Sequence, residues 1–475
     1  MTNLVDVLVV GAGPVGLNLA LALNKAGVQC RIIDSKAEPS KTSNAIGVNA
    51  RTLEIWKSMG FVGTAIANGI KLNQVKLFSG SKLLNHAGFD SVESEFNFML
   101  SLPQTQTERL LINELKKYNT HVEWNTKLTD LKDTNESVNI ALNSDFKEST
   151  LTAKWVVGCD GYHSKVRELA GFKQECHDLI QHFIMMDAKL SGNISKNDVS
   201  IVFNIAGVMV FIPMKDNVRV IAEVSNDPKF KDLKDGNLDI FTKILNERHP
   251  GVVIDSVDWL SDFNIHECLT SNFRNGHVFL AGDSAHSHSP AGAQGMNTGI
   301  QDSWNLAWKL AHVIKNEAKD SLLDTYNIER RGIANDVIKR SGGITKVATT
   351  NNKFIQLLRN LGVGGILSID LIRNKIVNSL QQTDICYENS PLINTNQVLY
   401  QNQTKFQNIG SKWFLLTKDE IPNPDLPGFI EIVRNPIYWS DQPLCLIRPD
   451  GYIAMYADSL FEISGYLAEN EITSA

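Results

Sequence analysis

The sequence predicts an α/β protein whose first domain is interrupted by an inserted, β-rich segment. Three observations support this fold class. The chain opens with a strand, a glycine turn, a helix and a second strand; short β-rich runs fill residues 176–265; and the strand-and-helix pattern returns at His277. Because 475 residues exceed the length of one ordinary core, we expect two or three domains.

The opening segment has the pattern of a Rossmann-like βαβ unit. Apolar residues 5–10 predict a buried strand, and residues 17–26 have the spacing of an amphipathic helix. A second strand at residues 29–33 ends at Asp34. Further helices are expected at residues 51–59 and 108–117, which suits an α/β domain.

The turn between the first strand and helix contains Gly11, Gly13 and Gly16 in a Gly-x-Gly-x-x-Gly pattern. The first glycine permits the turn, the second lets backbone approach a pyrophosphate, and the third lets the helix pack on the strand. The helix N-terminus, with about half a positive charge, then faces the phosphates. Asp34 is placed to accept the adenosine ribose hydroxyls. The unit therefore predicts a dinucleotide site, for FAD or NAD, with Pro14, Val15, Ser35 and Lys36 beside it.

Residues 176–265 differ in character from the opening unit. Short β-rich runs at residues 199–205, 208–213 and 218–224 are separated by polar turns, which predicts an inserted sheet. A strand at residues 277–282 and a long helix at 297–314 then resume the first domain, which is discontinuous in sequence. Helical patterning continues over about residues 322–377, and the last segment alternates short strands with turns.

Composition argues against several classes of protein. A net charge of -6, from 46 Lys and Arg against 52 Asp and Glu, lacks the basic footprint of a nucleic-acid-binding protein. No stretch approaches the roughly 20 apolar residues of a membrane-spanning helix, and the N-terminus lacks the basic leader of a signal peptide. The six cysteines show no CxxC pattern, so we expect free thiols and a cytoplasmic location.

Residues 278–310 carry a resemblance to a known family. They read VFLAGDSAHSHSPAGAQGMNTGIQDSWNLAWKL and resemble the pattern GD…H…P…G.G.N.G..D..NL.WKL of the class A flavoprotein monooxygenases. That family includes para-hydroxybenzoate and phenol hydroxylases and the hydroxylases of aromatic polyketides and antibiotics. Residues 158–167 resemble its G-x-D-G-x-x-S-x-V-R pattern. Smaller matches at residues 51–54, 102–111 and 323–331 extend the resemblance over nearly the whole chain.

The resemblance implies bound FAD and assigns residues to it. Asp283 is implied to hold a ribityl hydroxyl, and the helix beginning at Gly295-Met296-Asn297 to point its N–H groups at the pyrimidine edge of the isoalloxazine. Such a helix end stabilises the negative charge of reduced flavin near N1 and O2. The backbone at Pro290 is implied to lie beside the reactive carbon, which makes it the one predicted catalytic position.

Other cofactor contacts are carried over from the same family. Asp160 and Gly161 are implied to lie near the pyrophosphate, and Gln104 to contact the flavin. The chain departs from many relatives at Asn44, where they have arginine, and at Ser35, where they have glutamate. The remaining predicted contacts are Lys36, Arg51, Leu128 and Gly282.

Two conspicuous pairs of residues are interpreted without a metal or a second cofactor. His286 and His288 have no third ligand beside them, so we assign them to packing and flavin contacts, and expect no metal. Trp304 and Trp308 share one helix face, which is typical of core packing.

The resemblance also divides the chain into domains. We expect an FAD-binding domain at residues 1–175 and 266–390, the second part with a helical extension, and a substrate-binding sheet at 176–265. Residues 446–454, LIRPDGYIA, resemble the thioredoxin-like C-terminal domain of the phenol and polyketide hydroxylases, which sets the last domain at 391–475. Cys445 has no nearby partner cysteine, so this domain is interpreted as structural and compatible with a homodimer.

The family chemistry predicts an FAD-dependent monooxygenase. NAD(P)H reduces the flavin, and O2 then forms a C4a-hydroperoxide that hydroxylates a phenolic or polyketide-like small molecule. The inserted sheet is expected to cover the substrate, with Phe203, Phe211 and Pro213 as candidate contacts; no general base is identified. The alternative is a non-catalytic flavin-binding redox sensor or scaffold. A halogenase is disfavoured because the sequence lacks a W-x-W-x-I-P segment.

Overall fold

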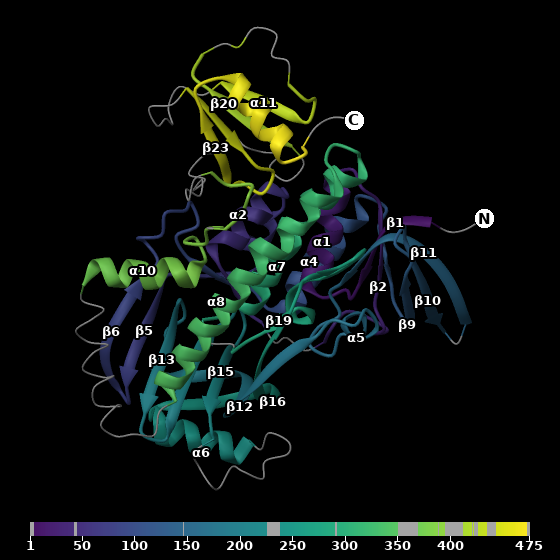
Figure 1. The fold of residues 1–475 in the computed structure, drawn as a ribbon. Helices are drawn as coiled ribbons and strands as arrows, with labels where there is room; N and C mark the ends of the chain where they lie inside the picture. The colour runs from purple at the N-terminus through teal and green to yellow at the C-terminus, as the bar shows by residue number, and fades with distance from the viewer. Residues whose placement is uncertain are drawn as a thin grey trace.

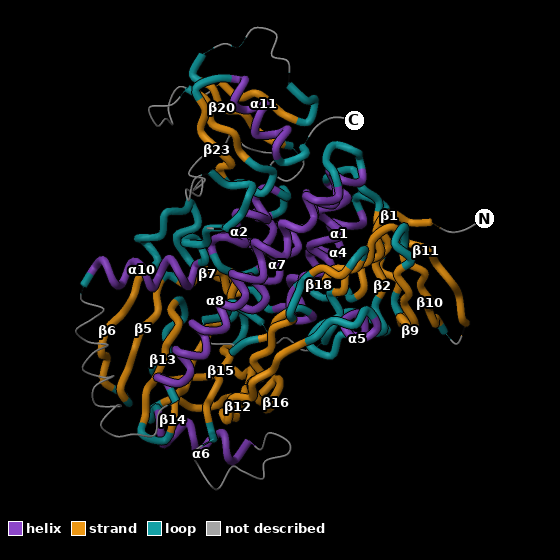
Figure 2. The backbone as a smooth tube through the Cα atoms, viewed as in Figure 1, coloured by secondary structure: helices purple, strands orange, loops and turns teal. Residues whose placement is uncertain are grey.

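The structure is a computed structural model, and it places the elements in two large sheets, a small three-stranded sheet and a C-terminal sheet (Figures 1 and 2). It describes residues 4–41, 45–145, 147–225, 238–289, 292–349, 369–387, 389–394, 412–419, 421, 426–434 and 443–472. No helix within these ranges has both the length and the apolar character needed to cross a lipid bilayer.

The first large sheet is the Rossmann-like core that the sequence predicts. Strand β1 pairs in parallel with both β2 and β11, and its last four residues are buried. Helix α1 follows β1, contacts β1 and β2, and packs against α4 and α7, so it covers one face of this part of the sheet. The strand order is β17 (Arg274–Asn275), β18 (Val278–Leu280), β11 (Lys147–Gly158), β1 (Leu4–Val10), β2 (Cys30–Ile33), β8 (Val122–Glu123), with β10 (Val138–Ser144) also paired to β11 and β9 (Thr126–Asp133) paired to β10.

Helices and a small sheet surround this core. The predicted helices at residues 51–59 and 108–117 are confirmed, each beginning earlier than expected, as α2 and α4. Their bounds and those of their neighbours are α1 (Pro14–Lys25), α2 (Ala50–Ser58), α3 (Val62–Asn68), α4 (Gln104–Lys116) and α5 (Lys165–Leu169). The small sheet has the order β3 (Gly47–Val48), β7 (Met99–Ser101), β4 (Ile70–Leu72).

The second large sheet contains the predicted insert, two strands from upstream of it and one, β19 (His286–Ser287), from downstream. The expected runs near residues 199–224 form β13, β14 and β15, whereas β5 and β6 come from upstream of residue 176. Helix α6 (Leu238–Arg248) packs its apolar side chains against this sheet. The order is β19 (His286–Ser287), β16 (Val252–Thr270), β12 (Gln174–Gly192), β15 (Val218–Glu223), β14 (Gly207–Pro213), β13 (Asp198–Asn204), β5 (Gln74–Ser79), β6 (Lys82–Gly88).

Helix α7 (Gly295–Ile314) runs through the middle of the molecule (Figure 1). It is buried without interruption from Asn297 to His312 and contacts α1, α2 and α8 (Asp324–Ala348). Trp304 and Trp308 both lie in the core, as the sequence predicts. Because a helix buried on every side must satisfy its polar side chains inside the protein, α7 fixes the position of many partners.

The C-terminal domain packs against the far end of α7. Its mixed sheet has the order β21 (Ile430–Arg434), β20 (Trp413–Thr417), β22 (Leu444–Ile447), β23 (Ile453–Ala457), and α11 (Leu460–Glu469) follows; α10 (Asp370–Gln381) precedes the domain. Trp413 of β20 meets Trp308 of α7 edge-on, with ring centroids 5.7 Å apart. The two side chains belong to one apolar cluster, so the C-terminal domain and α7 share a core.

A buried ion cluster joins this domain to α7 and α8. The Arg448 guanidinium donates to both Glu329 oxygens at 2.7 and 3.0 Å and to both Asp450 oxygens at 3.0 and 2.5 Å. Lys309 of α7 donates to Glu329 at 2.7 Å. Burial raises the pKa of Glu329, but Arg448 and Lys309 together hold that pKa well below its usual range. The RPDG segment therefore places a charge-balancing arginine between the domains.

The expectation of six free cysteines is wrong for two of them. Cys176 and Cys268 form a disulfide, with Cα atoms 4.1 Å apart. They are directly opposite in the antiparallel register of β12 and β16, which brings together residues from distant parts of the sequence. The described cysteines Cys30, Cys159, Cys386 and Cys445 are not joined in a disulfide.

We predict that Arg448→Met strongly destabilises the protein. Glu329 and Asp450 would lose their shared cation inside the core, so the free energy of unfolding should fall by about 3–5 kcal/mol. Urea unfolding followed by tryptophan fluorescence measures this change. Lys412→Met is the control, because its half-exposed pair with Glu431 should contribute less than about 1 kcal/mol. Equal losses in both variants would contradict the role assigned to Arg448.

Candidate functional site

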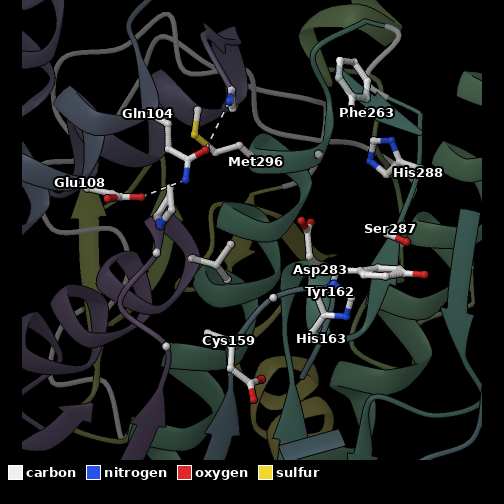
Figure 3. Close-up of a pocket in the computed structure, with 18 of the residues that line it drawn as sticks. Gln104, Glu108, Cys159, Tyr162, His163, Phe263, Asp283, Ser287, His288 and Met296 are labelled. Atoms are coloured by element: carbon white, nitrogen blue, oxygen red, sulfur yellow. Dashed lines mark hydrogen bonds between the residues drawn. The ribbon is translucent and has the colours of Figure 1, made fainter. Parts of the chain in front are cut away.

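A cavity of about 1090 Å³ lies between the two large sheets. Its lining runs from the glycine turn after β1, past the start of α7, to strands β12, β14, β15 and β16 of the second sheet. Figure 3 shows Gln104 and Glu108 at one side of the cavity and Phe263 and His288 at another. One cavity therefore touches both the predicted dinucleotide motif and the predicted substrate sheet.

The glycine turn supplies one end of the cavity. An added Cβ at Gly13 would meet nothing within 4 Å, whereas at Gly16 it would lie 1.9 Å from the Gly11 carbonyl oxygen. Gly13 therefore faces open space in the cavity, and Gly16 serves the packing of α1. Gly13 is also the N-cap of α1 and brings no side-chain cap, so the first N–H groups of the helix are free to meet phosphate oxygens.

Asp34 lies beside this turn, and the backbone of the turn holds its carboxylate in place. Its Oδ2 accepts from the Ala12 N–H at 2.7 Å, and its Oδ1 accepts from the Lys36 N–H at 2.8 Å. Each carboxylate oxygen keeps a second lone pair. Because Asp34 also lines the cavity, it can accept a ribose hydroxyl without losing its bonds to the backbone.

Asp283 lies in the wall of the cavity, on a short 3-10 turn at Gly282–Ser284. Its side chain is exposed to the cavity, and among the described residues we find no hydrogen-bond donor to it. Surrounding protein raises the pKa of the Asp283 carboxyl by desolvation, while nearby His286 lowers it. A carboxyl group of this kind is suited to accept hydroxyl hydrogen bonds from the ribityl chain of FAD.

The start of α7 lies next along the cavity. Gly295 and Met296 line it, and the N-cap residue Gln294 makes no side-chain capping bond. The first N–H groups of a long buried helix therefore face the cavity with the positive end of the helix dipole. This arrangement fits the electron-rich N1 and O2 edge of a flavin ring. Together with Gly13, the residues present fit FAD.

Most of the predicted cofactor residues meet in this one cavity. Those that line it are Gly11, Gly13, Pro14, Val15, Asp34, Ser35, Lys36, Gln104, Leu128, Asp160, Gly161, Asp283, Gly295 and Met296. Asn44 and Pro290 lie outside the described residues, so their predicted roles stay predictions.

Four predicted cofactor residues lie outside the cavity lining: Gly16, Arg51, Gly282 and Asn297. Arg51 is buried towards the C-terminal domain, where it donates to Glu54 at 3.0 Å and to the Asp450 carbonyl at 2.9 Å. Asn297 donates to the Gly47 carbonyl at 2.9 Å, which ties α7 to β3. The side chains of Arg51 and Asn297 shape the protein around the site.

Asp160, predicted to lie near the pyrophosphate, also has hydrogen-bond partners within the protein. It lines the cavity, yet its carboxylate caps helix α5, accepting from the Ser164 hydroxyl at 2.5 Å and from the Lys165 N–H at 2.7 Å. The Asp-Gly segment therefore fixes the turn that carries Gly161, with φ of +79°, along the cavity. Backbone at Gly161, more than the Asp160 side chain, is available to a cofactor.

The second sheet forms an apolar wall of the cavity. Met185, Ile212, Ile221, Phe263 and Ile265 line it, and Phe263 stacks on Phe183 with ring centroids 5.5 Å apart. Arg219 also lines this wall, held by Asp187 through two bonds of 2.7 Å.

The predicted substrate residues Phe203, Phe211 and Pro213 are not among the lining residues, although Phe203 packs in the same apolar cluster as the lining residues Phe263 and Ile265. Side chains alternate along a strand, so Ile212 faces the cavity while Phe211 packs in the core under α6. Phe203 packs in a separate apolar cluster. For Phe211 the strand β14 was identified correctly, but the face of the sheet was not.

His288 is a cavity residue that the sequence analysis assigned only to packing or flavin contact. Its Nδ1 lies 2.8 Å from the Ser289 carbonyl oxygen and must donate there, which leaves a lone pair on Nε2. Burial lowers the pKa of His288 to about 4, so the ring is neutral near pH 7. Sequence analysis also missed Glu108, Tyr162 and His163 in the lining, although all three stand in segments that match the family pattern.

Comparisons with known proteins agree with this site. Residues 4–341 match the family model described as FAD binding domain. The chain is 30% identical over 394 residues to 6-methylpretetramide 4-monooxygenase of Streptomyces rimosus, covering 82% of this chain and 71% of that protein. It is 26% identical over 486 residues to rifampicin monooxygenase of Rhodococcus hoagii, covering 98% and 97%. The solved structure of the anhydrotetracycline hydroxylase OxyS from Streptomyces rimosus aligns with a TM-score of 0.81 at 25% identity, covering 99% of this chain and 100% of that one.

We predict that Gly13→Val abolishes FAD binding without disturbing the fold. The backbone at Gly13 is extended, with φ of -76°, so valine fits the turn but projects into the space for the pyrophosphate. The melting temperature of the apoprotein should stay within about 2 °C of wild type, while FAD titration shows no binding. Gly16→Ala should instead lower the melting temperature, because its Cβ overlaps the Gly11 carbonyl. A yellow Gly13→Val protein would contradict the placement of the cofactor.

Proposed function

Because the chain belongs to the class A FAD-dependent aromatic hydroxylases, we propose that it hydroxylates a phenolic or polyketide-like small molecule with NAD(P)H and O2. Relatives named for 6-methylpretetramide, rifampicin and anhydrotetracycline support substrates of this class. We further propose that the enzyme is cytoplasmic, which cell fractionation would check. We also propose that it forms a homodimer, which light scattering would check.

One observation carries the proposal. The cavity that contains Gly13, Asp283 and Gly295 continues to the apolar wall at Ile212 and Phe263. A protein that only stored or sensed flavin would need the first set of residues and not the second. Space beside the flavin-facing helix, lined by apolar and aromatic side chains, supports a co-bound aromatic molecule and favours a hydroxylase over a redox sensor or scaffold.

When bound, FAD would supply the redox chemistry that passes electrons from NAD(P)H to O2 and one oxygen atom to the substrate. The chain supplies position and environment. The N–H groups after Gly13 and the carboxylate of Asp34 would hold the pyrophosphate and ribose, and Asp283 the ribityl hydroxyls. The N–H groups at Gly295 and Met296 would hold the pyrimidine edge of the ring.

The second sheet would orient the substrate and exclude water. Phe263 offers a ring face for aromatic stacking, and Ile212 and Ile221 shield the reacting region from solvent. His288 would remain neutral there and accept hydrogen bonds through Nε2, without releasing protons at working pH. Water exclusion matters because it prevents the reduced flavin from wasting oxygen as hydrogen peroxide.

The direct test is substrate-stimulated turnover. Purified protein loaded with FAD is mixed with NADPH or NADH in air, with a panel of phenols, naphthacene polyketides and rifamycins. We expect at least one compound to accelerate NAD(P)H oxidation and to gain one labelled oxygen atom under oxygen-18 gas, seen by mass spectrometry. Bound FAD with no stimulation by any member, and peroxide as the only oxygen product, would favour the sensor or scaffold.

We predict that neighbouring residues of β14 have opposite phenotypes. Ile212→Trp fills the cavity wall, so the KM for the substrate should rise by about tenfold or more while the melting temperature and FAD affinity are kept. Phe211→Ala empties the core under α6 and should lower the free energy of unfolding by about 3–5 kcal/mol. Steady-state kinetics and urea unfolding measure the two effects. Matching phenotypes would show that the strand is oriented differently.

A further inference from the structure

Asp302 is a fully buried carboxylate in the second turn of α7, and it does not line the cavity. Both of its oxygens accept hydrogen bonds. Oδ2 accepts from the Gly282 N–H at 3.1 Å and lies 2.6 Å from His286 Nε2, while Oδ1 accepts from Arg330 Nε at 2.7 Å. The side chain therefore connects α7 and α8 to the turn that begins at Gly282.

That turn carries Asp283, the next residue. Gly282 has φ of +65°, in the left-handed region that favours glycine, so the chain turns sharply there. On the other side of the turn, the Ser284 hydroxyl lies 2.6 Å from the Gly158 carbonyl oxygen of β11. Asp283 is thus presented between two anchors, one in the sheet and one, Asp302, in the helix whose N-terminus faces the cavity.

The charge on Asp302 is balanced within the protein. Burial raises the pKa of Asp302, but His286 and Arg330 together hold it below its usual value. Arg330 is itself held by the Thr298 carbonyl and by the Tyr387 hydroxyl, each at 3.2 Å. A charged carboxylate with fixed partners is a stronger and more rigid acceptor for the Gly282 N–H than a neutral group would be.

We propose that Asp302 is a positioning residue, which sets Asp283 at the distance from the N-terminus of α7 that one FAD molecule requires. The proposal rests on the proposed role of Asp283 as the ribityl anchor. It assigns Asp302 to the flavin half of the cofactor alone, because Asp34 and the glycine turn, which would hold the adenosine end, belong to other elements.

Asp302→Asn is the sharpest variant. Each oxygen of Asp302 accepts a hydrogen bond. An asparagine has one oxygen, so it can accept on one side only, and its NH2 group must face the donor on the other side. If its oxygen keeps the Arg330 contact, the NH2 faces the Gly282 N–H and displaces the turn. Asp302→Asn leaves the Arg330 charge unpaired, and the variant could fail to fold for that reason. In that case, the double variant Asp302→Asn with Arg330→Gln removes both charges and is tested in the same way.

The experiment compares the affinities for FAD and ADP by calorimetric titration of apoprotein. For Asp302→Asn and for Asp283→Asn we expect FAD affinity to fall by about ten- to a hundredfold, with ADP affinity unchanged. In the double variant the two losses should not add, because both act through one contact. A purely structural role would instead weaken FAD and ADP binding alike and give additive losses.

Glu54→Gln is the matched control. Glu54 is a buried carboxylate paired with Arg51 and is not part of the cavity lining. The Glu54→Gln variant should have a lower melting temperature, while its ratio of FAD affinity to ADP affinity stays as in wild type. If Asp283→Asn weakens FAD but Asp302→Asn does not, or if the losses add, the positioning role is overturned. If Asp283→Asn binds FAD with wild-type affinity, Asp283 is not the ribityl anchor, and the positioning role of Asp302 is overturned as well. The proposed hydroxylase activity is tested separately, by substrate-stimulated turnover.

Discussion

Burial of α7 is the constraint on which the rest of the structure depends. The helix carries Asp302 and Lys309 into the buried interior, where an unpaired charge costs several kcal/mol. Asp302 is therefore matched by Arg330, and Lys309 by Glu329, both from α8. Because these pairs allow one relative placement of α7 and α8, they also determine where the N-terminus of α7 enters the cavity.

The two ion clusters connect parts of the chain that would otherwise be independent. Towards the cavity, Asp302 holds the Gly282 N–H and with it the turn of Asp283. Towards the C-terminus, Glu329 accepts from Arg448, and Asn305 of α7 donates to Asp450 at 3.1 Å. The C-terminal domain thus stabilises the helix whose N-terminus faces the cavity, although none of its described residues lines the cavity, and this gives its RPDG segment a physical role.

Local features of the sequence predicted the fold and many of the residues that line the cavity, while features set by long-range contacts were missed. The glycine turn and the start of α7 could be predicted because each is one continuous segment. The choice between Ile212 and Phe211 could not, since alternation alone does not say which face of a sheet meets the cavity. The pairing of Cys176 with Cys268 depends on strand register. Asp160 was recognised by its motif, but only the structure shows that its carboxylate caps a helix.

The central claim is that one cavity holds FAD with its adenosine at Asp34 and its isoalloxazine at the N-terminus of α7. A crystal structure of the FAD-loaded protein tests this most directly. The account predicts density for the ribose beside Asp34, for the ribityl chain beside Asp283, and for the pyrimidine edge of the ring at Gly295 and Met296, with open space between ring and Phe263. Flavin bound elsewhere, or a ring facing away from α7, would contradict it.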